Sequence, residues 1–195
     1  TGIGKTFAYL TAGILHGKCR AAEGKPQRPI LISTSSIALQ GAIIHDYLPF
    51  LSKVMMADGM LDSPLRAVLR KGKSHYVCDA RLMKRLQTAN LDRKNPLAKA
   101  ALLSMRDHLD LDMAPHLSGY DRERICVPPT CDCGKTECRY LCYLDVCASE
   151  RYAIQVCNHN LLLADAIHRG SGKRSILPDS CAIVMDEAHK LPETA

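Results

Sequence analysis

The chain has 195 residues and a formal net charge of +6, and 47% of its residues are hydrophobic although tryptophan is absent. This length suits one sizeable domain or a domain with an insertion, and the composition predicts an aliphatic core. No run of 18 apolar residues occurs, so we expect no membrane span. The chain begins without methionine, and we expect it to be a fragment of a longer protein.

The first residues match the end of a phosphate-binding loop. Gly2, Ile3, Gly4, Lys5 and Thr6 fit the last part of the pattern G-x-x-x-x-G-K-[ST], whose first glycine would precede the chain. In such a loop, backbone N–H groups at a helix start bind the β- and γ-phosphates of a nucleotide. Lys5 would neutralise charge on the phosphate oxygens, and Thr6 would bind Mg²⁺.

The next residues predict alternating helices and strands. Apolar spacing predicts a helix over 7–15, and a polar loop follows over 18–29. Ile30–Ile32 predicts a short buried strand, and the hydroxyls of residues 33–36 are suited to cap a helix over Ile37–Leu51. This order is typical of a doubly wound sheet.

The pattern changes in residues 52–150, where we find no convincing buried strand. We predict basic helical stretches over 79–88 and 97–109 and a cysteine-rich loop over 126–147. We call residues 66–85 the basic window because their net charge equals the net charge of the whole chain. Its charged residues are Arg66, Arg70, Lys71, Lys73, Arg81, Lys84 and Arg85, with Asp79 as the one acid. Such a window suits a polyanion such as nucleic acid, but charge alone favours a solvated helix face.

The ten cysteines indicate a metal site rather than disulfides, because the nucleotide motif predicts a reducing cytoplasm. Cys157 and Cys181 lie in apolar runs and are expected in the core, and Cys19 is isolated. A tight group remains, in a loop that contains proline and glycine: Cys126, Cys131, Cys133 and Cys138. Zinc and an iron–sulfur cluster both take four thiolates, but the spacing differs from the paired C-x₂-C of a zinc ribbon.

The last part of the chain returns to the α/β order. We predict a strand over Ala153–Cys157, a helix over Leu161–His168 and a final strand over Cys181–Met185. The final strand leads into Asp186, Glu187 and His189. Asp186 would bind Mg²⁺, Glu187 would polarise the attacking water, and His189 would be a sensor or coupling residue. Together with Lys5, these residues predict a site for ATP and Mg²⁺.

The order of these motifs resembles DinG/XPD-type helicases, which are superfamily 2 DNA helicases with an iron–sulfur domain inserted in the first motor domain. The resemblance is closest to bacterial DinG-like proteins and covers nearly the whole chain. It rests on five segments: Gly2–Thr6, Lys71–Cys78, the cysteine group, Cys157–Leu162 and Asp186–His189.

The resemblance implies a [4Fe–4S] cluster. The Lys71–Cys78 segment matches the family element that supplies the first ligand, Cys78, and Cys138 with the tyrosine that follows it matches the last. Cys126 and one of Cys131 and Cys133 would complete the four, with Cys142 as an outside candidate. The family also implies a 5′→3′ motor on single-stranded DNA or on DNA with a single-stranded overhang, in a bacterial cytoplasm and in DNA repair.

We therefore expect an α/β fold with a RecA-like, doubly wound and mostly parallel sheet. Residues 1–69 would begin motor domain 1, residues 70–150 would form the iron–sulfur insertion, and residues 151–195 would return to the motor domain. We expect an ATP-hydrolysing helicase whose fragment alone turns over little ATP. Two alternatives stay open: a helicase-like nuclease of the same family, and a metal- or redox-sensing DNA-binding module with a relic nucleotide site.

Overall fold

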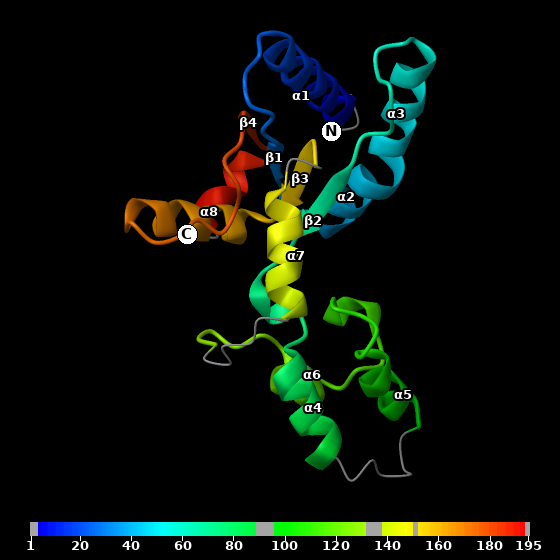
Figure 1. The fold of residues 1–195 in the computed structure, drawn as a ribbon, viewed down its shortest axis with the longest axis vertical. Coiled ribbons are helices and arrows are strands. Elements are labelled where there is room, and N and C mark those ends of the chain that lie inside the picture. The colour runs from blue at the N-terminus through cyan, green and yellow to red at the C-terminus, as the bar shows by residue number, and fades with distance from the viewer. Residues whose placement is uncertain (1–3, 89–95, 132–137, 150–151, 194–195) are drawn as a thin grey trace. The chain divides into compact units, whose positions relative to one another are not determined.

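The computed structural model describes residues 4–88, 96–131, 138–149 and 152–193 (Figure 1). The chain divides into two compact units. We call residues 1–71 and 147–195 the sheet unit, and residues 72–146 the helical unit.

The sheet unit contains a four-stranded sheet with the order β2-β3-β1-β4, in which every described strand pair is parallel. Its strands are β1 (Ile30–Ser33), β2 (Ala67–Arg70), β3 (Ile154–Cys157) and β4 (Ala182–Met185). Ser33 pairs with both Cys157 and Met185, so three strands end level with one another. In a parallel sheet, this carboxyl edge is where ligands bind.

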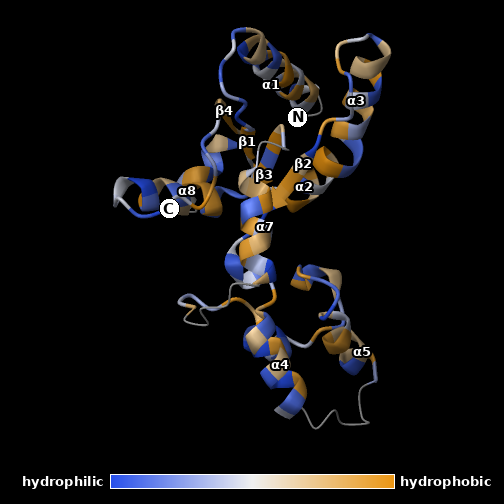
Figure 2. Ribbon diagram, viewed as in Figure 1, coloured by the Kyte–Doolittle hydropathy of each residue, from blue (hydrophilic) through white to orange (hydrophobic). Residues whose placement is uncertain are grey.

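Helices cover both faces of this sheet. They are α1 (Lys5–Ala22), α2 (Ile37–Ala42), a π-helical turn (Ile43–Tyr47), α3 (Leu48–Ala57) and α8 (His159–Gly170). Ile30 and Ile32 of β1 pack in one aliphatic cluster with residues of α1 and α3, whereas Leu31 packs in another with residues of α8. Neighbouring strand residues point to opposite faces, so the same short strand serves both clusters. Figure 2 shows the hydrophobic colouring of these strands.

The predicted α/β class with a parallel sheet is therefore confirmed, and the arrangement is consistent with a RecA-like fold. The last described element of the unit is a 3₁₀ helix over Ala188–Glu193.

The helical unit is built from α4 (Asp79–Thr88), α5 (Pro96–Ser104), α6 (Gly119–Ile125) and all but the end of α7 (Arg139–Ala148), with 3₁₀ turns at Lys73–His75 and Leu111–Met113. Its core includes Val77, Leu102, Leu111 and Ile125, each at most 1% exposed. Two isolated antiparallel bridges, one of them between Val77 and Cys126, replace a sheet in the part of this unit that the structure describes.

Two predictions for residues 52–150 are wrong. Strand β2 lies there, although its four residues end in a charged side chain and show no apolar alternation. Arg70 is nevertheless 4% exposed, because Gln155 and the carbonyl of Ile176 accept its hydrogen bonds. The expected loop over 126–147 contains helix α7, whose cysteines hid its apolar spacing.

Helix ends also differ from the predictions. Helix α1 continues past Gly17. A glycine inside a helix destabilises it by about 1 kcal/mol relative to alanine, and a helix of 18 residues tolerates this loss. It ends at Ala22. Two residues later, Gly24 has a φ of 70°, which permits a Schellman motif: the N–H of Gly24 donates to the carbonyl of Ala21, and the N–H of Lys25 donates to the carbonyl of Arg20. Helix α5 stops at Ser104 rather than 109. The predicted helix over 37–51 instead extends to Ala57 through the π-helical turn.

Within the described ranges, we find no helix with both the length and the hydropathy that a membrane crossing requires.

Candidate nucleotide and metal sites

The phosphate-loop residues within the described ranges stand at the start of α1. Gly4 has a φ of 70°, and Lys5 begins the helix directly after it. No side chain caps this helix start among the described residues, so its first N–H groups face outward. Lys5 is exposed and Thr6 is half-buried. This is the geometry that binds an anion, while Gly2 and Ile3 lie outside the described residues.

The acidic pair follows β4 at the carboxyl edge of the sheet. The backbone N–H of Asp186 donates to the carbonyl of Ser33 at 2.9 Å, which fixes the strand end against β1. The backbone N–H of Glu187 donates to Oδ1 of Asp186 at 3.1 Å. Glu187 has a φ of 52°, a left-handed conformation that is uncommon for a residue with a side chain.

Two donors hold the side chain of Glu187. Lys190 Nζ lies 3.2 Å from Oε2, and Ser35 Oγ donates to the same oxygen at 3.1 Å. The hydrogen bond and charge of Lys190, and then the hydroxyl of Ser35, lower the pKa of Glu187, and the neighbouring His189 adds to this effect. Glu187 therefore stays ionised at neutral pH.

The sequence reasoning missed both Ser35 and Lys190 as neighbours of Glu187. Ser35 lies in the run of hydroxyls over 33–36 that the sequence predicts as a helix cap. The usable signal was its position directly after β1, because parallel strands place their following residues at one edge.

Tyr9 connects the helix start with the acidic pair. Burial raises the pKa of the Tyr9 phenol, and the charge of the Asp186 carboxylate raises it further. Tyr9 lies one turn after Thr6, whose side-chain hydrogen bond lowers the pKa of the same phenol. A threonine hydroxyl and a carboxylate are oxygen ligands of the kind that Mg²⁺ prefers, so this donor set fits the metal.

A buried side-chain hydrogen bond joins the end of β1 to the start of α8 at the same edge. Ser33 Oγ lies 2.6 Å from Nδ1 of His159, and both residues are at most 1% exposed. Burial raises the pKa of the adjacent Cys157 thiol to about 11. Cys157 is thus an uncharged core residue at neutral pH, as its apolar strand predicted.

The candidate cluster cysteines lie in the helical unit. The backbone N–H of Cys78 donates to the carbonyl of Ile125 at 2.8 Å, and Val77 forms its bridge with Cys126. These bonds bring the chain segments of Cys78 and Cys126 side by side. Cys78 is 6% exposed and Cys126 is half-buried.

The other candidate ligands differ in exposure. Cys138 directly precedes α7 and is half-buried, whereas Cys131 is exposed. Cys133 lies outside the described residues. In the described ranges, no three His, Cys, Asp or Glu side chains lie close enough together to hold a metal ion. The cluster site therefore stays a prediction.

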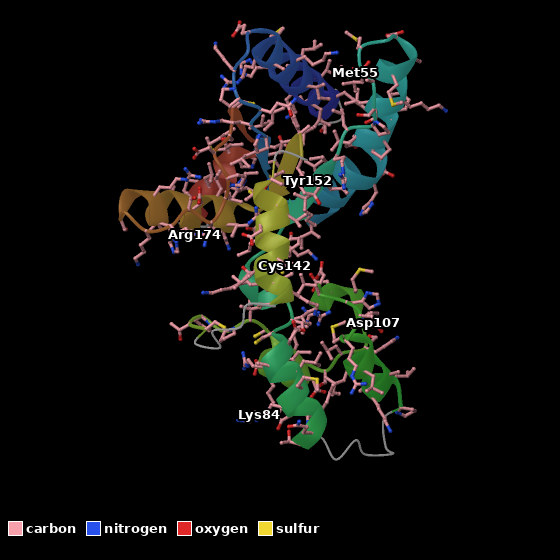
Figure 3. The ribbon with its side chains drawn as sticks, in the orientation of Figure 1. Met55, Lys84, Asp107, Cys142, Tyr152 and Arg174 are labelled. Carbon is pink, nitrogen blue, oxygen red and sulfur yellow. The ribbon has the colours of Figure 1, made fainter. Side chains whose placement is uncertain are left out.

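The basic window does not form one surface. Arg70 is buried in the sheet unit, while Arg81 and Arg85 donate hydrogen bonds to other residues of the helical unit. Lys84 is exposed on α4 (Figure 3). Most of the arginines in the window that the structure describes therefore have structural partners, which charge counting cannot reveal.

No family model matches the chain. Over 213 residues it is 28% identical to the ATP-dependent DNA helicase YoaA of Haemophilus influenzae, covering 100% of this chain and 29% of the relative. It is 26% identical over 218 residues to the ATP-dependent helicase DinG of Mycobacterium tuberculosis, covering 99% of this chain and 31% of the relative. It is also 28% identical over 209 residues to the 3′-5′ exonuclease DinG of Bacillus subtilis, covering 100% of this chain and 20% of that relative.

The predicted resemblance to DinG-like helicases is thus confirmed over the whole chain. The chain spans less than a third of the length of these relatives.

Proposed function

We propose that the chain forms the ATP-binding part of a DNA helicase or translocase that acts on single-stranded DNA. The observation that carries this proposal is the presence of two motifs, an uncapped helix start and an acidic pair that follows a strand of a parallel sheet. The uncapped start of α1 brings Lys5 and Thr6, and the end of β4 brings Asp186 and Glu187. The effect of Asp186 on the Tyr9 phenol supports their proximity.

Each residue has a separate task in ATP hydrolysis. Lys5 and the N–H groups after Gly4 bind the β- and γ-phosphates and neutralise their charge. Thr6 and Asp186 hold Mg²⁺, which supplies positive charge to the phosphate oxygens. Glu187 orients water and accepts its proton as the water oxygen bonds to the γ-phosphorus and the bond to the β–γ bridging oxygen breaks.

The helical unit is proposed to bind a [4Fe–4S] cluster through Cys78, Cys126, Cys138 and one of Cys131 and Cys133. The donor set fits because four thiolates are the usual ligands of such a cluster. The pairing of the Cys78 and Cys126 segments supports the assignment of those two residues. When bound, the cluster would join separate segments of the helical unit through iron–sulfur bonds.

The proposed substrate is single-stranded DNA, or duplex DNA with a single-stranded overhang, and the proposed direction is 5′→3′. The direction rests on the family resemblance. The relatives named as ATP-dependent DNA helicases support the DNA substrate.

A nuclease of the same family is the second candidate, because one relative is named a 3′-5′ exonuclease. In that case a further domain of the parent protein would cut the DNA, and the ATP site would serve regulation or movement.

ATP hydrolysis by the full-length parent, measured with and without single-stranded DNA, tests the proposal. We expect DNA to stimulate hydrolysis and Lys5→Ala to abolish it, since that substitution removes a positive charge from the reacting phosphates. A matched control is Lys18→Ala, which changes an exposed lysine on the same helix away from its first turn. Hydrolysis that survives Lys5→Ala would refute the nucleotide site, and DNA cleavage without ATP-driven unwinding would favour the nuclease.

A further inference from the structure

Two arginines of the helical unit have side chains fixed next to candidate cluster cysteines. Arg139 directly follows Cys138, and Arg81 lies three residues after Cys78. Neither arginine belongs to the proposed ligand set.

Arg139 ties the segment of Cys138 to the segment of Cys78. Its Nε and Nη2 donate to Oδ1 of Asp79, the residue after Cys78, at 2.8 and 2.5 Å. The same guanidinium donates from Nη1 to the carbonyl of Arg106 at 2.9 Å and from Nη2 to the carbonyl of Met105 at 3.0 Å. All three of its nitrogens are therefore engaged, and they join the start of α7 to the start of α4 and to the segment after α5.

Arg81 makes the corresponding connection to the segment of Cys126. Its Nη1 donates to the carbonyl of Cys126 at 2.7 Å, and its Nη2 donates to the carbonyl of Glu123 at 2.8 Å. Nη1 also lies 3.7 Å from Sγ of Cys126.

The hydrogen bonds of Arg139 and Arg81 fix the positions of chain segments more than they add to the free energy of unfolding. The side chains of Arg139 and Asp79 are 34% and 30% exposed, and an exposed ion pair alone adds little stability. A planar guanidinium that donates to several fixed acceptors, however, restricts the direction of the backbone that carries it. The backbone next to Arg139 carries Cys138, and the carbonyl that accepts from Arg81 belongs to Cys126.

We propose that Arg139 and Arg81 are positioning residues that hold the segments of Cys138 and Cys126 near Cys78 before the cluster assembles. This inference rests on the proposed cluster. Prior ordering reduces the conformational entropy that metal binding must overcome, so the arginines increase cluster retention without contacting iron.

The test uses the full-length parent purified without oxygen, with iron and sulfide measured per chain and iron release followed in excess ferrous chelator. We expect Arg139→Ala and Arg81→Ala to bind the cluster about 10-fold less tightly, the effect typical of residues that support metal ligands. Faster iron release reports this loss. Arg139→Lys keeps the charge but cannot donate to three acceptors in one plane, so we expect only partial recovery.

The matched control is Arg85→Ala. Arg85 lies on the same helix as Arg81 and pairs with Asp121 at 2.6 Å, but it adjoins no candidate cysteine. Its side chain and that of Asp121 are only 21% and 10% exposed, so its loss disturbs the unit at least as much as loss of Arg139 does. We expect Arg85→Ala to keep wild-type iron release.

The outcomes separate this inference from the proposal on which it rests. Iron-free wild-type protein would overturn the cluster and the inference together. Iron-loaded wild-type protein with unchanged release from both alanine variants would overturn the inference alone. Equal loss from Arg85→Ala would show a general effect of stability, and would also overturn it. Arg139→Gln, which retains volume and one amide donor, replaces Arg139→Ala if that variant does not fold.

Discussion

Different interactions stabilise the sheet unit and the helical unit internally. The sheet unit has a continuous aliphatic cluster built on strands such as β1 and β3, whose backbone groups pair with each other. The helical unit packs short helices around a smaller core, and arginines such as Arg81 and Arg139 join its segments. Figure 2 shows the mixed hydropathy of α4 in this unit. The difference suggests that the sheet unit is ordered by burial, whereas the helical unit depends on polar links and on the proposed cluster.

The largest expected effect is loss of order in one unit only. In the full-length parent, Cys78→Ser should remove the cluster and cause rapid amide exchange at bonds such as Val77 N–H to Leu109 and Cys78 N–H to Ile125. Strands β1 and β3 should stay protected because their pairing does not involve the helical unit. Hydrogen exchange with mass spectrometry measures both, and Cys19→Ser is the control. Equal loss of protection in the two units would refute the comparison.

Glu187→Gln should affect the proposed function of the sheet unit and leave that of the helical unit unchanged. We expect ATP hydrolysis to fall about 10²–10⁴-fold because the amide cannot accept a proton from water. ATP binding and iron content should not change. Wild-type hydrolysis by this variant would show that Glu187 does not have the assigned role.

A core substitution in each unit should show how separately the units unfold. Ile154→Ala in the sheet unit and Leu111→Ala in the helical unit each remove a side chain that is 0% exposed. Each should cost about 2–5 kcal/mol of unfolding free energy. We expect each variant to shift only the transition of its own unit, as calorimetry of the parent would show. A common shift in both transitions would mean that the units unfold together.

Ser35→Ala has the smallest expected effect. Its hydroxyl donates one hydrogen bond to Glu187, and a bond of this kind contributes about 0.5–1.5 kcal/mol. We therefore expect turnover of ATP to fall by about 2- to 10-fold, with an unchanged KM. Ser36→Ala is the control, because Ser36 caps α2 and is not bonded to Glu187 in the structure. Ser35→Thr, which keeps the hydroxyl, should restore turnover.

The sequence predicted the parts of the fold that depend on local patterns. The apolar runs that became β1, β3 and β4 were recognised because they are short, apolar and followed by polar residues. Strand β2 was missed because its conformation depends on tertiary pairing with β3 and on partners for Arg70. Helix α7 was missed because cysteines suggested a loop.

The candidate sites show the same division. Motif spacing predicted Lys5, Asp186 and Glu187 as site residues because it depends on their order along the chain. It could not identify Ser35 or Arg139, whose partners lie 152 and 60 residues away in sequence. Contacts of that kind become visible only when the chain is folded.

Gln155 gives the sheet unit one further property. Its side chain accepts a hydrogen bond from Arg70, which ends β2 just before the chain leaves the unit, and donates one to the carbonyl of Cys147, where the chain returns. A single buried amide on β3 thus holds both ends of an excursion of 75 residues, from 72 to 146. The entropy of closing a loop grows only slowly with its length, so ends that are already held together can accept segments of very different size. The two hydrogen bonds of Gln155 therefore allow the helical unit to be replaced without redesign of the sheet. The replacement can be a short linker in the laboratory or another module during evolution.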